Sequence, residues 1–249
     1  MAEFDPAAEL RHYDRWQLAL RIAEIFGEGV YLRRGVTLEP GSLVFDVGAN
    51  VGVAATFFAS RCEAGVVHSF EPVAPLHELL VENTRRFAAC VPHGYGLASR
   101  PGTAEITFYR DTADMSGLHA HPERDRALLR RALINSGRSP RSADEELADR
   151  LIPERMSCEL RTLSSVIREL SVERVDLLKI DVEWAELDVI EGLAAPDWQR
   201  IRQLVAEVHD RSQGAAIGTI LRREGFHVAW EQDELLRGTP IQMLYATRG

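Results

Sequence analysis

Short apolar runs alternate with amphipathic segments along most of the chain. From Ser42 onward the apolar runs predict buried strands, and helical spacing between them predicts helices. The predicted strands are 43–49, 66–71, 90–98, 175–182, 203–209, 226–231 and 241–247, and the predicted helices are 51–61, 75–88, 163–170, 184–193 and 215–225. This order is typical of an α/β fold with a parallel sheet covered on both faces. A short link around Gly238 and Pro240 joins the last two strands, so we expect that pair to be antiparallel.

Two segments do not follow this alternation of strands and helices. Residues 7–26 carry apolar side chains at helical spacing, which predicts an N-terminal helical cap at 1–40 in front of a main domain at 41–249. Residues 111–155 form a long connection with two weak helical patterns around a flexible polar stretch. Connections of this length are typically lids or disordered insertions. Two interpretations of this insertion stay open: a cap over the ligand crevice, or a solvated excursion of the surface.

Composition limits the class of protein. Hydrophobic residues make up 45% of the 249 residues and charged residues 27%, the balance of an ordinary globular domain. The formal net charge of -9 disfavours nucleic acid or an anionic membrane as a partner. The three cysteines form no disulfide or zinc pattern, and the charged N-terminus lacks the apolar core of a signal peptide. We therefore expect a cytoplasmic protein, and the sequence leaves a homodimer open.

The sharpest local motif lies at 46–52, where Asp46, Gly48, Asn50 and Gly52 join a predicted strand to a helix. Glycines permit close approach of a ligand to the backbone, and the following helix presents free N–H groups to it. A dinucleotide-binding turn needs glycine at position 50, and Asp46 would repel a pyrophosphate there. S-adenosylmethionine carries a sulfonium and no phosphate, so an acidic lip made by Asp46 favours this donor over a nicotinamide cofactor.

The next predicted strand ends in Glu71 and Pro72, nineteen residues after Gly52. An acidic residue at the end of the second strand accepts hydrogen bonds from ribose hydroxyls in folds of this type. The alternative is an exposed glutamate in front of a proline that starts a helix. The spacing favours ribose binding by Glu71.

Two further predicted strands end in ionisable residues. Asp181 and Glu183 lie on one face of the first, at the edge where open α/β sheets bind ligands. We interpret Glu186 as a charge complement to the N-terminus of the helix that follows. Glu207 and His209 share one face of the second strand. A histidine is suited to act as a general base near neutral pH, but a lone histidine is as often a structural hydrogen-bond partner.

Nothing in the spacing demands a metal ion. Asp181, His209 and Asp210 would suit magnesium, but no motif requires it. In the insertion, His119 and His121 are candidates for contacts with a substrate.

Five blocks of sequence carry a resemblance to a known family. They are VFDVGANVG (44–52), HSFEP (68–72), LLVENTRR (79–86), LLKIDVEWAELDVIEGL (177–193) and LVAEVHD (204–210). In this order the chain resembles the FkbM-type S-adenosylmethionine-dependent methyltransferases over about residues 29–247. The resemblance implies a class I methyltransferase fold: a Rossmann-like sheet of seven mostly parallel strands, an antiparallel last strand and helices on both faces. The positions that match the cofactor loop, the ribose-binding acid and the acid after the fourth strand are Asp46, Gly48, Asn50, Gly52, Glu71 and Asp181.

The resemblance also implies methylation of a small molecule, usually at a hydroxyl of a secondary metabolite or a sugar, with N-methylation as an alternative. Adenine would lie against Leu97 and Ala98, and the acceptor would enter beside the N-terminal helix and the insertion. His209 is the first candidate for the base that removes the acceptor proton, and Asp181 or Glu183 is the second.

Two departures from the family pattern concern the acceptor. Trp184 stands where the family usually has glycine, so its indole would either stack on a flat substrate or block part of the pocket. The insertion at 111–155 is longer than the usual connection. Two rival functions remain at this stage: a nicotinamide-dependent oxidoreductase, and a non-catalytic cofactor-binding protein in which Trp184 closes the acceptor pocket.

Overall fold

A seven-stranded sheet runs through the molecule in the order β3-β2-β1-β7-β8-β10-β9. The computed structural model describes residues 4–63 and 65–248, so residues 1–3 of the predicted cap and residue 249 of the predicted main domain lie outside the described residues. Strand β10 is antiparallel to both of its neighbours, while the other adjacent strands are parallel, and the predicted antiparallel pair is therefore confirmed. The strands are β1 Leu43–Val47, β2 Val66–Phe70, β3 Cys90–His93, β7 Leu177–Ile180, β8 Gln203–Val208, β9 His227–Glu231 and β10 Gln242–Thr247.

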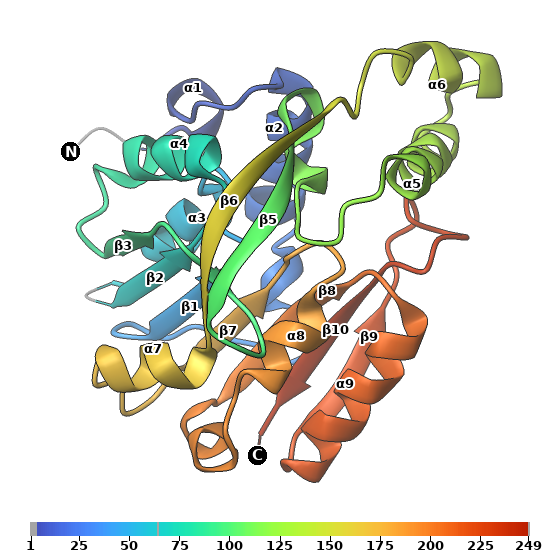
Figure 1. Ribbon diagram of the computed structural model, residues 1–249. Helices are drawn as coiled ribbons and strands as arrows, with labels where there is room; N and C mark the ends of the chain where they lie inside the picture. Colours follow the sequence, from blue (N-terminus) through green and yellow to red (C-terminus); the bar gives the residue numbers. More distant parts are fainter. Residues whose placement is uncertain (1–3, 64, 249) are drawn as a thin grey trace.

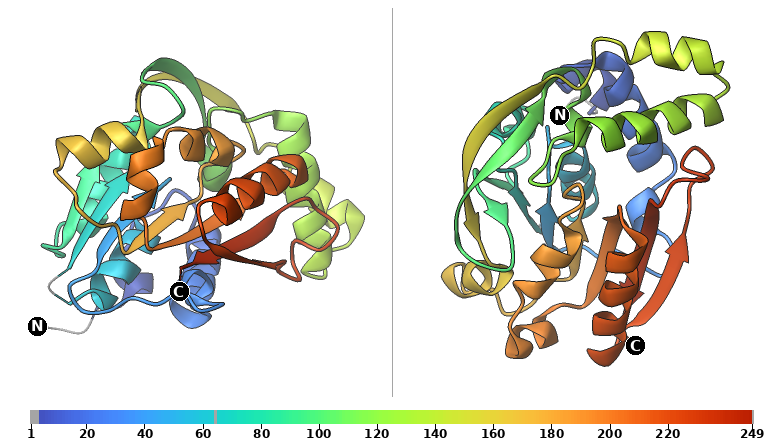
Figure 2. Two further views of the ribbon diagram at one scale, coloured as in Figure 1. Left: turned by 90° about the horizontal axis from the view of Figure 1, so that it is seen from below. Right: turned by 45° about the vertical axis from the view of Figure 1, so that its right-hand side comes forward.

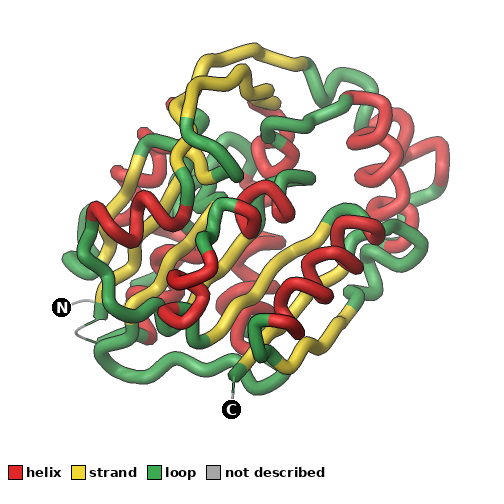
Figure 3. The backbone as a smooth tube through the Cα atoms, turned by 60° about the horizontal axis from the view of Figure 1, so that its bottom comes forward, coloured by secondary structure: helices red, strands yellow, loops and turns green. Residues whose placement is uncertain are grey.

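Helices cover both faces of this sheet (Figure 3). Because side chains alternate along a strand, Val44 and Leu177 pack into one apolar layer while Phe45 and Leu178 pack into the other. The predicted α/β class is confirmed. The first layer includes α2 Arg15–Ile22, α3 Val53–Arg61 and α4 Ala74–Thr84, and the second includes α7 Leu163–Glu169, α8 Glu186–Glu191, η4 Ala195–Arg200 and α9 Arg211–Arg223.

A second sheet of three strands, in the order β4-β6-β5, arches across the large sheet (Figures 1 and 2). It contains β4 Gly96–Leu97, β5 Gly102–Tyr109 and β6 Pro153–Arg161, with β5 and β6 antiparallel. The sequence pattern did not predict β6, because most of its residues are at least partly exposed and form no continuous apolar run. The prediction of one strand at 90–98 is wrong, since this segment divides into β3 of the large sheet and β4 of the small one.

The single helix predicted at 7–26 is also wrong. The segment forms α1 Pro6–Glu9 and α2, which continues as a π-helical turn, η1 Ala23–Gly27. Between α1 and α2, the side chain of Asn83 accepts the backbone N–H of Arg11 and donates to its carbonyl, which holds Arg11 outside a helix. Asp14 then caps α2.

The predicted insertion forms η3 Arg110–Met115, α5 Pro122–Asn135 and α6 Pro140–Glu146, and its last residues belong to β6. Leu133, Ala143 and Leu147 form a small core between the two helices. The first weak helical pattern, at 124–134, forms α5, but of the second, at 143–152, only residues 143–146 belong to α6. Both helices lie at the far end of the β5–β6 ribbon (Figure 1). In the described parts of the chain, no helix has the length and apolar character needed to cross a membrane.

Candidate active site

The turn after β1 is shaped by glycines that no other residue can replace without strain. Gly48 has a φ of +75°, and a Cβ atom there would lie 1.8 Å from the backbone oxygen of Asp181. Gly52 has a φ of +91°, and its Cβ would lie 2.8 Å from Leu80 Cδ1. Asn50 also adopts a left-handed conformation, with a φ of 49°. The glycine pattern therefore reflects close packing of the β1 turn against the end of β7 and against α4.

Asp46 does not form the acidic lip that the sequence predicts. Its side chain is fully buried, and its Oδ1 atom lies 2.9 Å from Nζ of Lys179, its register partner on β7. Lys179 also donates a 2.7 Å hydrogen bond to the carbonyl of Gly48. Because Lys179 neutralises the carboxylate below the turn, the charge argument based on Asp46 is wrong. The pair supports the turn from within the core.

Two narrow cavities flank the turn, and four residues line both of them: Gly48, Asn50, Asp114 and Asp181. We call one the apolar cavity, because its walls are mainly hydrophobic: Val47, Phe70, Pro72, Leu76, Leu97, Ile106, Leu118, Leu160, Val182 and Ala185. We call the other the charged cavity, because ionisable side chains face it: His12, Arg21, Tyr31, Asp114, Lys179 and Asp181. The small sheet supplies Leu97, Ile106 and Leu160, so it closes the apolar cavity from the side opposite the large sheet.

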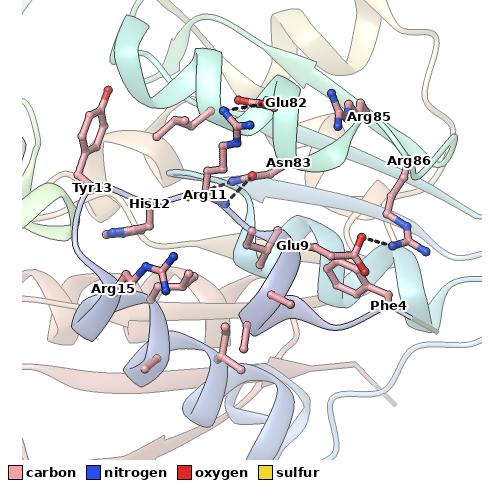
Figure 4. A pocket seen from close by; sticks show the side chains of 17 residues that line it. Phe4, Glu9, Arg11, His12, Tyr13, Arg15, Glu82, Asn83, Arg85 and Arg86 are labelled. Carbon is pink, nitrogen blue, oxygen red and sulfur yellow. Dashed lines mark hydrogen bonds and ion pairs between the residues drawn. The ribbon is translucent and has the colours of Figure 1, made fainter. Parts of the chain in front are cut away.

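A larger cavity of about 950 Å³ lies between the N-terminal segment and α4 (Figure 4). Arg11 pairs with Glu82 there, and Arg86 pairs with Glu9. This outer cavity shares only His12 with the charged cavity and no residue with the apolar cavity. Although this cavity is the larger one, it is not the candidate reaction site, because neither the turn glycines nor Asp181 line it.

Glu71 lies in the wall of the apolar cavity and is 5% exposed, which excludes the surface alternative. Its two carboxylate oxygens accept the backbone N–H groups of Asn50, at 2.9 Å, and of Val73, at 2.8 Å. Burial raises the pKa of Glu71 to about 7, despite these two hydrogen bonds. Of the other residues predicted near the nucleoside, Pro72 and Leu97 line the cavity and Ala98 does not.

Asp181 lies at the end of β7, beside the turn. Its Oδ2 atom accepts a 3.1 Å hydrogen bond from the hydroxyl of Tyr31 and lies 3.9 Å from Nζ of Lys179. Burial, reinforced by the carboxylate of Glu207, raises its pKa. The predicted location of Asp181 at the ligand crevice agrees with this geometry.

His209 is enclosed by carboxylates and is 1% exposed. Its Nδ1 lies 2.8 Å from Glu186, and its Nε2 lies 3.1 Å from Glu183 and 3.4 Å from Glu207. Burial alone would lower the pKa of His209, but the carboxylates of Glu183 and Glu186 raise it well above its usual value. A general base needs an unprotonated nitrogen directed at its substrate. This geometry favours a structural role for His209, and its predicted role as the base stays a prediction. Glu186 is a partner of His209 as well as the first residue of α8.

The backbone at position 184 is one that glycine adopts more easily than tryptophan. Trp184 has a φ of 71°, a left-handed conformation that favours glycine. The guanidinium of Arg124 on α5 lies 3.6 Å from the centre of an indole ring, so the insertion covers Trp184. Neither Trp184 nor the two predicted histidines line the apolar or charged cavity. His119 instead pairs with Asp188 at 3.2 Å, and His121 is the N-cap residue of α5.

The structure brings Asp181, Glu207 and His209 together, with ligand atoms within 4.8 Å of one another. Asp210, which the sequence suggested for the same set, instead caps α9 by accepting the N–H groups of Ser212 and Gln213. Both His209 nitrogens already face carboxylates, so this set does not fit a metal ion without rearrangement.

Most ionisable residues of the charged cavity were not predicted from the sequence, among them Arg21, Tyr31 and Asp114. Arg21 and Tyr31 precede the glycine turn, and Asp114 lies in η3 of the insertion. Charged residues are common in such surface segments, so nothing in the sequence set these three apart.

The fold and the site together define a class I methyltransferase that uses S-adenosylmethionine. The model of the Methyltransferase FkbM domain matches residues 46–228, and the chain belongs to this family. Membership of this family excludes the alternative of a nicotinamide-dependent oxidoreductase. The close approach of Gly48 to the backbone of Asp181 and the buried carboxylate of Glu71 fit a nucleoside donor that lies beside the turn.

Two curated proteins show how far the similarity extends. The chain is 38% identical to the 31-O-demethyl-FK506 methyltransferase FkbM of Streptomyces tacrolimicus, over 97% of this chain and 94% of that protein. It is 41% identical to the AMB antimetabolite synthetase AmbE of Pseudomonas aeruginosa, over 90% of this chain but only 11% of the much longer synthetase. Among solved structures, Aeropyrum pernix fibrillarin in complex with S-adenosyl-L-methionine has 13% identity and a TM-score of 0.49, over 90% of this chain and 74% of that one.

Proposed function

We propose that the protein transfers a methyl group from S-adenosylmethionine to a hydroxyl of a small molecule, such as a secondary metabolite or a sugar. The observation that carries the proposal is Asp181, whose carboxylate lines both cavities and has a pKa raised by burial. A hydroxyl loses its proton when it is methylated, and a buried carboxylate with a raised pKa is suited to accept that proton. The name of the Streptomyces relative, which describes an O-methyltransferase, agrees with a hydroxyl acceptor.

In this proposal S-adenosylmethionine supplies the electrophilic methyl group. Asp181 binds the acceptor hydroxyl and takes its proton, while Tyr31 fixes the orientation of the carboxylate through a 3.1 Å hydrogen bond. Glu71 binds the ribose of the donor, and Leu97 packs against its adenine. Most of the rate acceleration then comes from holding acceptor, methyl group and donor in line.

His209 acts as a positioning residue in this proposal. As an imidazolium between Glu183 and Glu186 it fixes the loop that follows β7. Glu183 is the second candidate for the base, because it lines the apolar cavity and burial raises its pKa to about 7.

The insertion is proposed as a cap on the acceptor side. A mainly apolar cavity of about 90 Å³ separates α2 from the insertion helices, with Trp16, Leu20, Leu129 and Leu133 among its lining residues. Arg124 also extends from α5 onto Trp184, close to His209. An acceptor that enters between α2 and α5 would meet this apolar surface before it reaches Asp181. We place the enzyme in the cytoplasm, on the basis of its three unpaired cysteines.

The test combines labelled S-adenosylmethionine with matched panels of hydroxylated and aminated small molecules. We expect label in the hydroxylated panel, and we expect Asp181→Asn to lower kcat at saturating donor about 10²- to 10⁴-fold. Glu183→Gln tests the second candidate for the base and should lose much less turnover than Asp181→Asn. Label in amines alone would contradict O-methylation. A large loss in Glu183→Gln with little loss in Asp181→Asn would identify Glu183 as the base instead.

A further inference from the structure

The charged cavity lies across the Gly48 turn from the apolar cavity, and the function proposed above leaves it without a ligand group. The donor has two chemically different ends. One is an adenosine, which suits apolar walls, and the other is an amino acid with one carboxylate and one ammonium. If the adenosine occupies the apolar cavity, then the amino-acid end extends past Gly48 and Asp181 into the charged cavity.

Arg21 is the cation that is available in the charged cavity. It lies on α2 and its side chain is 26% exposed. Its Nε donates to Asp114 and its Nη1 to Glu24, each at 3.1 Å. A guanidinium carries five N–H donors, and Nη2 of Arg21 has no hydrogen-bond partner among residues 4–63 and 65–248. Its free N–H groups can therefore bind an anionic ligand.

The other basic side chains of this cavity already have partners. Lys179 is 2% exposed and pairs with Asp46 while it donates to the carbonyl of Gly48. Nδ1 of His12 accepts the backbone N–H of Asp14, and its Nε2 lies 3.7 Å from Asp114. Neither group offers a donor to a carboxylate without losing a contact within the protein.

Asp114 completes a complementary pair of charges. Arg21 holds one of its oxygens, and the side-chain amide of Asn50 donates to the other at 3.3 Å. Burial raises the pKa of Asp114, but the positive charge of Arg21 outweighs this effect and lowers the pKa to about 2. The carboxylate is therefore ionised at neutral pH. A fixed cation beside a fixed anion matches a zwitterionic amino-acid group.

We propose that Arg21 binds the carboxylate of the methyl donor and that Asp114 faces its ammonium. The proposal rests on the placement of the adenosine in the apolar cavity, but it does not depend on the acceptor. It makes the N-terminal segment part of donor recognition, because Arg21 precedes the matched family domain.

The test compares two donors that differ only in this carboxylate: S-adenosylmethionine and its decarboxylated form. Their dissociation constants are measured by calorimetry without acceptor, for the wild type, Arg21→Gln and Arg15→Gln. Charged hydrogen bonds contribute about 1.5 to 3 kcal/mol, so the wild type should prefer the carboxylated donor roughly 10- to 100-fold. Arg21→Gln should reduce this preference to about twofold or less, mainly by weakening binding of S-adenosylmethionine. Arg15→Gln, on the same helix but facing the outer cavity, should keep it.

The proposal fails if Arg21→Gln keeps the wild-type preference, or if the wild type shows no preference. It also fails if the variant weakens both donors equally, because Arg21 would then act only by holding Asp114 and η3 in place. A thermal unfolding curve accompanies each variant, and Arg21→Lys, which keeps the charge, should retain part of the preference. These binding measurements stay valid even if every hydroxyl acceptor fails, so failure here and failure of the proposed reaction are distinguishable.

Discussion

The two cavities beside Gly48 are built from different parts of the chain. The apolar cavity lies between the large sheet and the small one, with Ile106 and Leu160 among its walls. The charged cavity faces α2 and η3, where Arg21 and Asp114 meet. In the apolar cavity a ligand would be selected by burial and shape, and in the charged cavity it would be selected by opposite charges. In the proposed placement, a donor with a neutral and a zwitterionic end needs both cavities, which share Gly48 and Asn50 of the turn together with Asp114 and Asp181.

The largest effect is expected at that common turn. In Gly48→Ala the new Cβ meets the backbone of Asp181, which cannot move away as a flexible side chain could. We expect a loss of roughly 3 to 5 kcal/mol in the free energy of unfolding, measured by urea denaturation, together with loss of S-adenosylhomocysteine binding. Gly41→Ala is the matched control: Gly41 also has a positive φ, +81°, but no atom lies within 4 Å of the added Cβ. Equal losses in the two variants would show that backbone strain, and not the clash with Asp181, makes Gly48 necessary.

The second effect concerns the apolar cavity alone. Ribose hydroxyls donate to an ionised carboxylate, and Glu71 has a pKa of about 7. Affinity for S-adenosylhomocysteine should therefore rise about tenfold between pH 6 and pH 8, as the ionised fraction rises. In Glu71→Gln this rise should be absent, with weak binding at both pH values. Calorimetry at a series of pH values measures this pH dependence of the affinity for S-adenosylhomocysteine.

The control for this prediction is Glu183→Gln, because the pKa of Glu183 is also about 7. This variant should keep the pH dependence of donor affinity, and losing it would contradict the role of Glu71. Stability must be followed in parallel. A raised carboxyl pKa stabilises the folded state below the unfolded value of 4.5, and this contribution is lost as the pH rises through about 7. Donor affinity and folding stability therefore change in opposite directions across this window.

Much of this site follows from local sequence, because buried strands and glycine turns have local causes. The strands of the large sheet were predictable from continuous apolar runs, apart from the division at 90–98. The turn glycines were predictable because a positive φ restricts the residue type. The ribbon of β5 and β6 was not, since β5 is buried only in its second half and β6 only at Cys158, so neither strand carries a continuous apolar pattern.

Long-range charge pairing was the main source of error. Asp46 looked like an acidic lip because its partner, Lys179, is far away in sequence and becomes a neighbour only through the register of β1 and β7. One signal was present: each residue interrupts an apolar run predicted to be buried on both faces, where an unpaired charge is costly. The surroundings of His209 were not predictable either, because its three carboxylate partners come together only in the folded chain.

The smallest effect on donor binding is expected at Trp184, which lines neither of the two cavities. Trp184→Gly relieves the left-handed backbone, worth about 1 kcal/mol, but removes a buried indole and its contact with Arg124. Because burial of an aromatic ring contributes more than this strain, the variant should have a lower melting temperature. Its affinity for S-adenosylhomocysteine should stay within about twofold of the wild type, since neither the nucleoside nor the amino-acid end reaches the indole. A KM for the acceptor that changes while donor affinity does not would place Trp184 on the acceptor side. A parallel loss of donor affinity would instead mean that the loop after β7 transmits its conformation to Asp181, and that the two cavities are not independent.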